Sequence, residues 1–282
     1  MRGARIGVAI LAAATSLAAL AAPALQRAPD DGSVVIALDP FAGRLVTVPV
    51  VVRRQKLTLL LDTGGGQTLI TPRAAARIGC TPSGRSIGFR MTGERVVFEH
   101  CDTSALEIGG RTFVKSGLAV WDVMAVLPKE LPPLDGVLAL DTFVGQPFTL
   151  QLAARTLTLE SARSLERRVA TMTRVQARTA TGLAGGDMTM FVRGALDKRG
   201  WFLFDSGNLD LTLVAPHMVQ RRVAVPSQLE SGALSLDGLP TRNVPVSVRE
   251  IIYDGVLAED FLRQWIWTFR LASQELWAAP AR

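Results

Sequence analysis

Two short segments of the chain place an aspartate, a hydroxyl residue and a glycine in immediate succession. Asp62-Thr63-Gly64 follows one apolar run, and Asp205-Ser206-Gly207 follows another. An aspartate at the end of a buried strand lies in a loop, where glycine permits a sharp turn and brings backbone N–H groups near the carboxylate. The Thr or Ser hydroxyl is expected to hydrogen-bond locally and to brace that loop. Each segment therefore predicts one carboxylate presented at a strand end.

A pair of such carboxylates has a chemistry that neither has alone. If approximate two-fold symmetry brings Asp62 and Asp205 within a few ångströms, both cannot ionise easily, and one proton is shared. The ionised member can then act as general base on a water molecule, while the protonated member polarises a carbonyl group. This arrangement hydrolyses an amide without a covalent intermediate.

The sequence repeats itself in a way that supports such symmetry. Residues 135–157 and 254–276 align without a gap at an offset of 119 residues, and ten of the 23 aligned positions are identical. Upstream, residues 59–72 (LLLDTGGGQTLITP) and 202–216 (FLFDSGNLDLTLVAP) match with one inserted residue. An internal duplication predicts two lobes, roughly 34–160 and 171–282, each carrying one of the two aspartates.

The local patterns inside both halves are those of β-strands. Apolar and β-branched runs separated by turn residues predict hairpins, at residues 45–61, 86–98, 148–159 and 267–277. Short helices are expected at residues 72–78, 141–144, 216–220 and 260–264. The polar, Arg-rich residues 161–170 are expected to connect the lobes. The fold class predicted is all-β and bilobal, with a few short helices.

Two segments of the chain resemble those of a known family. The run LLLDTGGGQTLITPRAAARIG, starting at Leu59, resembles the active-site segment of retropepsin-like bacterial aspartic peptidases, and DGVLALDTF, starting at Asp135, is similar to their hydrophobic-hydrophobic-Gly loop. The second half carries both signals again. The resemblance covers nearly everything after residue 43. It implies a pepsin-like, duplicated β fold with a cleft between the lobes, closed by a flap hairpin.

The resemblance also implies roles for single residues. Asp62 and Asp205 carry over as the catalytic aspartates, and the residues that follow them carry over as loop supports, namely Thr63, Gly64, Ser206 and Gly207. The flap candidates are Met91, Thr92 and Gly93. The implied activity is that of an aspartic endopeptidase acting on peptides or proteins without a cofactor. The alternative is an inactive pepsin-like domain that binds peptides or a partner protein.

The sequence departs from the family pattern at several positions. Ala139 and Ala258 stand where the family places Gly, so an extra methyl group lies beneath each active-site loop. Gly65 and Asn208 replace the small residue usual after the triplet. The flap tyrosine typical of pepsins is missing, because the single Tyr of the chain is Tyr253.

The N-terminus indicates export. Arg2 and Arg5 precede an apolar run over residues 6–22 and then Pro23, which predicts a secretory signal peptide or an uncleaved anchor at residues 1–24. The expected location is periplasmic or secreted, with membrane attachment only if this segment is retained. In such a compartment Cys80 and Cys101, which flank the flap candidate, are expected to form a disulfide, the alternative being two free thiols.

Composition excludes several other classes of function. The 282 residues have a net charge of +6, but the basic residues are scattered and form no run interleaved with aromatic residues. A basic solvated surface is therefore favoured over nucleic-acid binding. With His100 and His217 as the two histidines and no metal-binding motif, no metal site is expected. Two non-identical halves on one chain favour a monomer over a homodimer.

Overall fold

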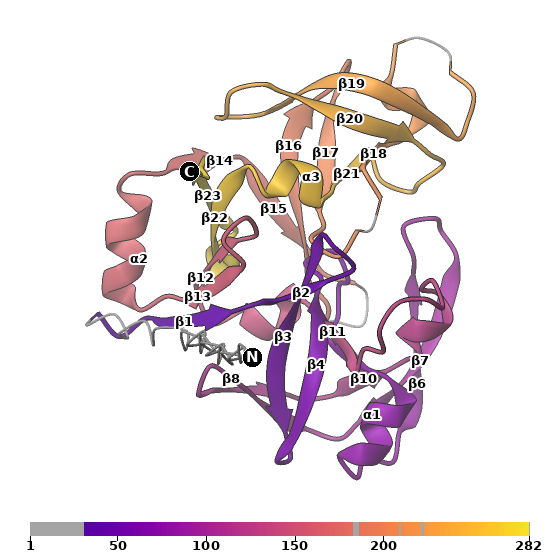
Figure 1. Ribbon diagram of the computed structural model, residues 1–282, viewed down its shortest axis with the longest axis vertical. Helices are drawn as coiled ribbons and strands as arrows, with labels where there is room; N and C mark the ends of the chain where they lie inside the picture. The colour runs from indigo at the N-terminus through magenta and orange to yellow at the C-terminus, as the bar shows by residue number, and fades with distance from the viewer. Residues whose placement is uncertain (1–30, 183–185, 209, 221–222, 282) are drawn as a thin grey trace, which may run out of the picture.

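The computed structural model describes residues 31–182, 186–208, 210–220 and 223–281. The expected signal peptide or anchor at residues 1–24 lies outside this part of the chain. Within the described ranges, no helix has both the length and the apolar character needed to cross a membrane. The described residues form three sheets with a few short helices (Figure 1).

The first half builds a 10-stranded sheet, which lies in the lower part of Figure 1. Its central strands run in the order β5, β11, β4 and β3, so that the hairpin predicted at residues 45–61 lies next to the repeated segment. The strands of this sheet are β2 (Asp39–Phe41), β3 (Leu45–Val52), β4 (Gln55–Leu61), β5 (Leu69–Ile70), β6 (Ser83–Phe89), β7 (Arg95–Cys101), β8 (Ser104–Ile108), β9 (Arg111–Lys115), β10 (Leu118–Val120) and β11 (Gly136–Leu138).

The second half builds a seven-stranded sheet with the same central plan. In each sheet the strand before the aspartate lies parallel to the strand of the repeated block, with Leu61 opposite Leu138 and Phe204 opposite Leu257. The duplication read from the sequence is therefore also a duplication of strand pairing. The strands are β15 (Ala177–Ala180), β16 (Thr189–Ala195), β17 (Arg199–Phe204), β18 (Thr212–Val214), β19 (Ser227–Leu236), β20 (Arg242–Val248) and β21 (Gly255–Leu257).

The third sheet takes strands from both halves. Its strands are β1 (Val34–Ala37), β12 (Phe148–Gln151), β13 (Thr156–Leu159), β14 (Thr173–Val175), β22 (Trp265–Arg270) and β23 (Glu275–Pro280). At its centre β12 pairs with β22, and Thr149 lies opposite Thr268, its own counterpart at the 119-residue offset. Their hydroxyl oxygens are 2.8 Å apart. An approximate two-fold axis thus passes between these two residues.

Aromatic side chains join the halves behind this axis. Phe148 stacks on Phe269 with ring centroids 4.5 Å apart, and Phe204, the residue before the second aspartate, meets Trp267 edge-on at 5.0 Å. These four side chains belong to one hydrophobic cluster that also contains Leu59 and Leu61 of the first half. Because the core is continuous, packing in the shared sheet fixes one lobe relative to the other. The division at residues 34–160 and 171–282 stays a prediction.

The fold is all-β and bilobal, as predicted, with short helices at or near the expected positions. Those expected at residues 72–78 and 260–264 are α1 (Pro72–Arg77) and α3 (Glu259–Leu262). Those at residues 141–144 and 216–220 are 3-10 turns, η2 (Leu140–Phe143) and η3 (Pro216–Met218). Two further 3-10 turns are η1 (Val123–Ala125) and η4 (Leu271–Ser273).

The connection at residues 161–170 is a helix, which the sequence analysis did not predict. Helix α2 (Ala162–Val169) begins at Ser161, whose hydroxyl accepts from the Ser164 N–H while the Ser164 hydroxyl accepts from the Ser161 N–H. This reciprocal pair is a capping box with Ser in place of the usual Glu or Gln at the third position. Because Ser164 stands at that position, the sequence lacks the usual Ser-x-x-Glu signal for the start of a helix.

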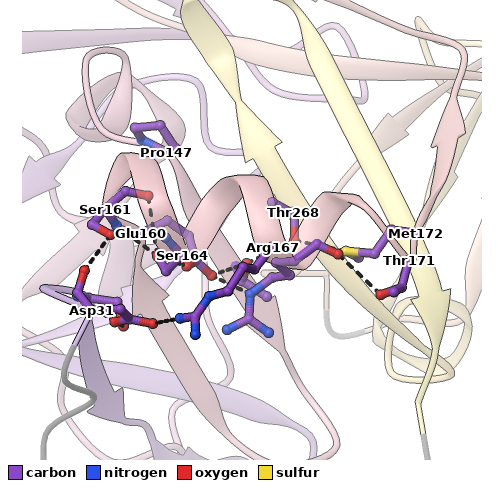
Figure 2. Close-up of polar contacts among 12 residues, drawn as sticks. Asp31, Pro147, Glu160, Ser161, Ser164, Arg167, Thr171, Met172 and Thr268 are labelled. Atoms are coloured by element: carbon purple, nitrogen blue, oxygen red, sulfur yellow. Dashed lines mark hydrogen bonds and ion pairs between the residues drawn. The ribbon is translucent and has the colours of Figure 1, made fainter.

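Figure 2 shows how α2 is attached to the shared sheet. The buried carboxylate of Glu160 accepts hydrogen bonds from the hydroxyls of Thr149 and Ser164 and forms an ion pair with Arg168. Arg167 forms an ion pair with Asp31 at the start of the described chain. A buried carboxylate is stabilised when it is paired and fully hydrogen-bonded. The connection is therefore anchored at the two-fold axis rather than free to swing.

Cys80 and Cys101 form a disulfide, with Cα atoms 5.7 Å apart. Cys80 lies just after α1, and Cys101 ends β7, the second strand of the flap hairpin. The bond closes a loop across a sequence separation of 21 residues. It therefore ties the base of the hairpin to the helix that follows the first aspartate loop.

Removing this bond is expected to lower the free energy of unfolding. Replacing both cysteines, Cys80→Ala with Cys101→Ala, should cost about 3 kcal/mol, because the closed loop reduces the entropy of the unfolded chain. Urea denaturation of the oxidised wild type and the double variant measures the difference. Wild type kept in a reductant is the control and should denature close to the double variant. Equal midpoints for all three samples would show that the bond adds nothing to stability.

Candidate active site

Each aspartate is held at the end of a central strand by the repeated block beside it. The Asp62 N–H donates to the Leu138 carbonyl at 3.0 Å, and the Asp205 N–H donates to the Leu257 carbonyl at 3.1 Å. These bonds extend the parallel pairing of β4 with β11 and of β17 with β21 by one residue. The two aspartates therefore occupy equivalent positions in the two sheets.

The repeated Asp-Gly pair explains the close fit of these strands. The Asp135 carboxylate accepts from the Thr58 N–H at 2.9 Å, and the Asp254 carboxylate accepts from the Trp201 N–H at 2.8 Å. The next residue, Gly136, approaches the backbone so closely that an added Cβ would lie 2.1 Å from the Leu69 carbonyl oxygen. The Asp fixes the strand before each aspartate loop, and the Gly allows the neighbouring backbone to pass.

The structure brings the two carboxyl groups into contact, and a hydrogen bond joins Asp62 to Asp205. Within each loop the carboxyl also accepts a backbone hydrogen bond, from the Gly64 N–H to Asp62 Oδ1 at 3.0 Å and from the Gly207 N–H to Asp205 Oδ1 at 2.9 Å. Asp205 is buried and Asp62 is partly buried. The two segments thus form a carboxyl dyad of the kind that the spacing suggested.

The hydroxyl residues brace the opposite loop rather than their own. The Thr63 hydroxyl donates to the Phe204 carbonyl at 2.9 Å, and the Ser206 hydroxyl donates to the Leu61 carbonyl at 2.8 Å. The Ser206 N–H also donates to the Thr63 hydroxyl oxygen at 2.9 Å, and the Thr63 N–H donates to the Ser206 hydroxyl oxygen at 3.2 Å. The expectation of a local hydrogen bond was therefore wrong, because all four bonds cross between the halves and lock the two loops together.

The electrostatics of the dyad are asymmetric. Burial raises the pKa of Asp62, although the hydrogen bond from Asp205 partly offsets this. Burial raises the pKa of Asp205 further, because the negative charge of Asp62 and the hydrogen bond to it also favour the protonated form. Both carboxyls therefore favour the protonated form, and the pKa of Asp205 is raised more than that of Asp62. A pair that shares one proton supplies a general base and a proton donor in contact.

The two alanines that depart from the family pattern are buried directly behind the dyad. The Ala139 N–H donates to the Thr68 hydroxyl at 3.0 Å, and the Ala258 N–H donates to the Thr212 hydroxyl at 3.4 Å. The same departure in both halves is accommodated symmetrically, since the two carboxyl groups remain in contact. An extra methyl at these positions therefore does not separate the loops.

Asp141 and Asp260, the first residues of the helices predicted at residues 141–144 and 260–264, do not cap those helices. The residues in the cap position are Ala139 and Ala258, and neither makes a side-chain cap bond. Asp141 instead accepts from the Thr68 hydroxyl at 2.6 Å and pairs with Lys115 at 2.6 Å. Asp260 accepts from Thr212 at 3.1 Å. Both aspartates orient the threonine that binds the backbone behind the dyad.

The flap candidates lie at the turn between β6 and β7 and reach the second half of the molecule. The Met91 carbonyl accepts from the Ile252 N–H at 2.9 Å, and the Met91 side chain packs in a cluster with Leu203 and Tyr253. A Cβ added at Gly93 would lie 3.3 Å from Ile252. Thr92 is exposed. The tip of the hairpin is therefore docked on the segment just before the second repeated block.

Tyr253 is a candidate site residue that the sequence analysis did not place here. It comes from the second half, yet it packs beside the flap tip. Burial raises the pKa of Tyr253, and the negative charges of Asp205 and Asp187 raise it further. The sequence signal that could have placed Tyr253 near the dyad is its position just before Asp254-Gly255, because that repeated block lies beside the second aspartate loop.

Comparison with known proteins supports the assignment of the fold but gives no information about enzymatic activity. No protein-family model matches the chain, and no curated protein matches its sequence. Among solved structures, it is similar to basic 7S globulin from soybean and to conglutin gamma, a unique basic 7S globulin from lupine seeds. Both share 11% identity with it at a TM-score of 0.56, covering 88% of this chain and 95% of theirs.

These two neighbours have the pepsin-like fold, and the present chain therefore has it too. At such low identity the likeness establishes the fold alone. The narrower resemblance to bacterial retropepsin-like peptidases rests on the sequence motifs and stays a prediction.

Proposed function

We propose that this protein is an aspartic endopeptidase, in which Asp62 and Asp205 activate a water molecule for attack on a peptide bond. The observation that carries the proposal is the contact between the two carboxyl groups, held by four hydrogen bonds that cross between the halves. A pair that merely stabilised the fold would not need two buried like-charged groups, because an apolar pair of similar size would avoid the cost of desolvation.

Each group has a defined role in the proposed reaction. We assign the ionised role to Asp62, which removes a proton from the bound water as the water oxygen attacks the carbonyl carbon. We assign the protonated role to Asp205, which donates a hydrogen bond to the carbonyl oxygen as negative charge develops there. The backbone N–H groups of Gly64 and Gly207 each donate a hydrogen bond to the carboxyl of their own loop and so help to hold it in position. Collapse of the tetrahedral intermediate transfers a proton to the leaving amine and restores the dyad.

The remaining parts of the proposal concern cellular location, oligomeric state and substrate class. We propose that the protein is exported to the periplasm or the exterior, which the disulfide between Cys80 and Cys101 supports. We propose that it acts as a monomer, because one chain supplies both halves of the dyad. The substrate class is a peptide or protein in extended conformation, and the two carboxyls and a water suffice without a cofactor.

Some proteins of pepsin-like fold are catalytically inactive, so activity must be measured directly. The test is incubation of the purified, folded protein with a mixed peptide library from pH 3 to pH 8, with new termini identified by mass spectrometry. The expected result is cleavage at internal peptide bonds, rather than removal of residues from the peptide termini only. Folded protein that binds library peptides but cleaves none at any pH would overturn the peptidase proposal and favour the binding domain.

A further inference from the structure

One face of the second sheet continues from the dyad into a cluster of aromatic and cationic residues. Side chains two apart on a strand share a face, so Trp201 and Leu203 of β17 lie on the same face as Asp205. Directly opposite on β16, Arg193 pairs with Trp201 and Phe191 pairs with Leu203. Residues opposite one another in an antiparallel pair also share a face. The cluster is therefore continuous with the strand that ends at the dyad.

Contacts link this face to the flap. Phe191 meets Tyr253 edge-on with ring centroids 5.4 Å apart, and both belong to the cluster that holds Met91. Arg178 of β15 lies opposite Phe191 and places its guanidinium carbon 5.8 Å from that ring. The same guanidinium lies 4.3 Å from the Trp201 ring. An unbroken series of side chains thus leads from the flap tip to Trp201.

Two guanidinium groups lie over one tryptophan at the end of this series. The guanidinium carbon of Arg193 lies 5.3 Å from the Trp201 ring, in addition to Arg178. Trp201 and Arg193 are partly exposed, and Arg178 is exposed. A guanidinium that stacks on an aromatic face keeps the N–H groups at its edge available for a carboxylate.

The charge of these two groups is not neutralised within the described part of the chain. Neither guanidinium forms an ion pair with a described carboxylate, and each is held by its aromatic contacts. Arginine stacking on tryptophan does not by itself leave the charge unpaired. Arg270 also lies over a tryptophan ring, Trp277, but pairs with Glu275 at 2.9 Å. Among the described residues, the pair over Trp201 therefore has no carboxylate partner, and it lies on the face that carries the dyad.

We propose that Arg178, Arg193 and Trp201 form a binding subsite for the carboxylate of an acidic residue, Asp or Glu, in an extended substrate. The subsite rests on the proposed peptidase function and deepens it by assigning a substrate class. Trp201 lies four residues before Asp205, which corresponds to about 13 Å along a strand. An extended peptide has nearly the same rise per residue, so the acidic residue binds two to four residues from the scissile bond.

The test compares peptides that differ in one group. A cleavable peptide carries Glu at each position in turn, up to four residues on either side of the scissile bond, and a matched series carries Gln. The wild type is expected to show a kcat/KM about fivefold to tenfold higher for Glu than for Gln at one position only, two to four residues from that bond. The preference should weaken as salt is raised, because the subsite is exposed.

Variants assign the preference to the two arginines. Arg178→Gln and Arg193→Gln should each reduce the ratio of kcat/KM for the Glu peptide to kcat/KM for the Gln peptide towards one. Arg178→Glu should reverse the preference in favour of a Lys peptide. Arg199→Gln is the matched control, because Arg199 lies on β17 with Trp201 but pairs with Asp237 at 3.0 Å. Its ratio should equal that of the wild type.

Failure of the subsite and failure of the peptidase can be told apart. Equal cleavage of the Glu and Gln peptides at every position would overturn the subsite and leave the peptidase standing. If no peptide is cleaved, the peptidase proposal fails, and the subsite is decided by fluorescence anisotropy with labelled forms of the same peptides. Tighter binding of one Glu peptide, lost in Arg178→Gln, would support the subsite, and equal binding of Glu and Gln peptides would overturn it.

Discussion

Asp62→Asn and Asp205→Asn are each expected to reduce peptide cleavage by about 10²- to 10⁴-fold, because either change removes the general base or the proton donor. Asn is nearly isosteric with Asp, and it can still accept the backbone hydrogen bonds from Gly64 or Gly207. The fold should therefore persist. Cleavage rates measure the loss of activity in both variants. Circular dichroism and the thermal midpoint of each variant show whether the fold is retained.

The control for this pair is Asp102→Asn, since Asp102 is exposed and lies far from the dyad in sequence and in sheet position. It should retain the rate of the wild type. If either dyad variant cleaves as well as the wild type while remaining folded, the assignment of the chemistry to this pair is wrong.

The same two carboxyls set the pH dependence of both activity and stability. Activity should follow a bell, because losing the shared proton or adding a second one removes one of the two roles. For stability the sign is also defined. The raised pKa of Asp205 means that the folded state binds its proton more tightly than the unfolded state. Its contribution is full below the ordinary carboxyl pKa of 3.8 and is lost as pH rises through the folded pKa.

Asp205→Asn does not titrate, so the variant should gain stability relative to the wild type as pH rises above about 4. Chemical denaturation of both proteins at several pH values measures the gap. A gap that stays constant with pH would mean that Asp205 titrates normally and that the two carboxyls are not coupled.

The sequence was sufficient to predict the parts of the fold that depend on repetition and on strand pattern. The hairpin at residues 45–61 and the block at residues 135–157 follow from alternation and from the 119-residue offset. They also suffice to place Asp62 and Asp205 at equivalent strand ends. The hairpin follows from periodicity within one segment, and the repeated block follows from direct comparison of two segments, so neither inference requires knowledge of a contact in space.

Contacts made across the two-fold axis could not be predicted in the same way. Thr149 and Thr268 are identical in the repeat, but identity alone does not indicate that the two residues meet. Thr63 and Ser206 were expected to bond within their own loops, because sequence spacing reveals local partners and hides those 143 residues away. Tyr253 was noted only as the single tyrosine of the chain. Its place beside Met91 depends on how the two halves dock.

The two glycines of the dyad loops provide a test of geometry that removes neither carboxyl group. A Cβ added at Gly207 would lie 2.3 Å from the Asp62 Cγ, and one added at Gly64 would lie 2.5 Å from the Asp205 Cγ. Non-bonded carbon atoms are separated by about 3.5–4.0 Å at their optimum. Each methyl must therefore displace the carboxyl of the opposite half by more than about 1 Å.

Gly207→Ala and Gly64→Ala are accordingly expected to lower kcat/KM by about 10²-fold or more, because a misplacement of about 1 Å at a reacting group has that effect. Overpacking should also cost about 1–3 kcal/mol of the free energy of unfolding. Gly145→Ala is the matched control, since a Cβ there meets no atom within 4 Å. Cleavage assays and urea denaturation of the three variants separate the two effects.

The comparison is informative because the carboxyls themselves are intact. If the dyad performs the reaction, Gly207→Ala should fail through Asp62 and Gly64→Ala through Asp205, although neither glycine carries a reactive group. A folded Gly207→Ala protein with the cleavage rate of the Gly145→Ala control would show that close contact between the two halves is not required, and the dyad mechanism would then be wrong.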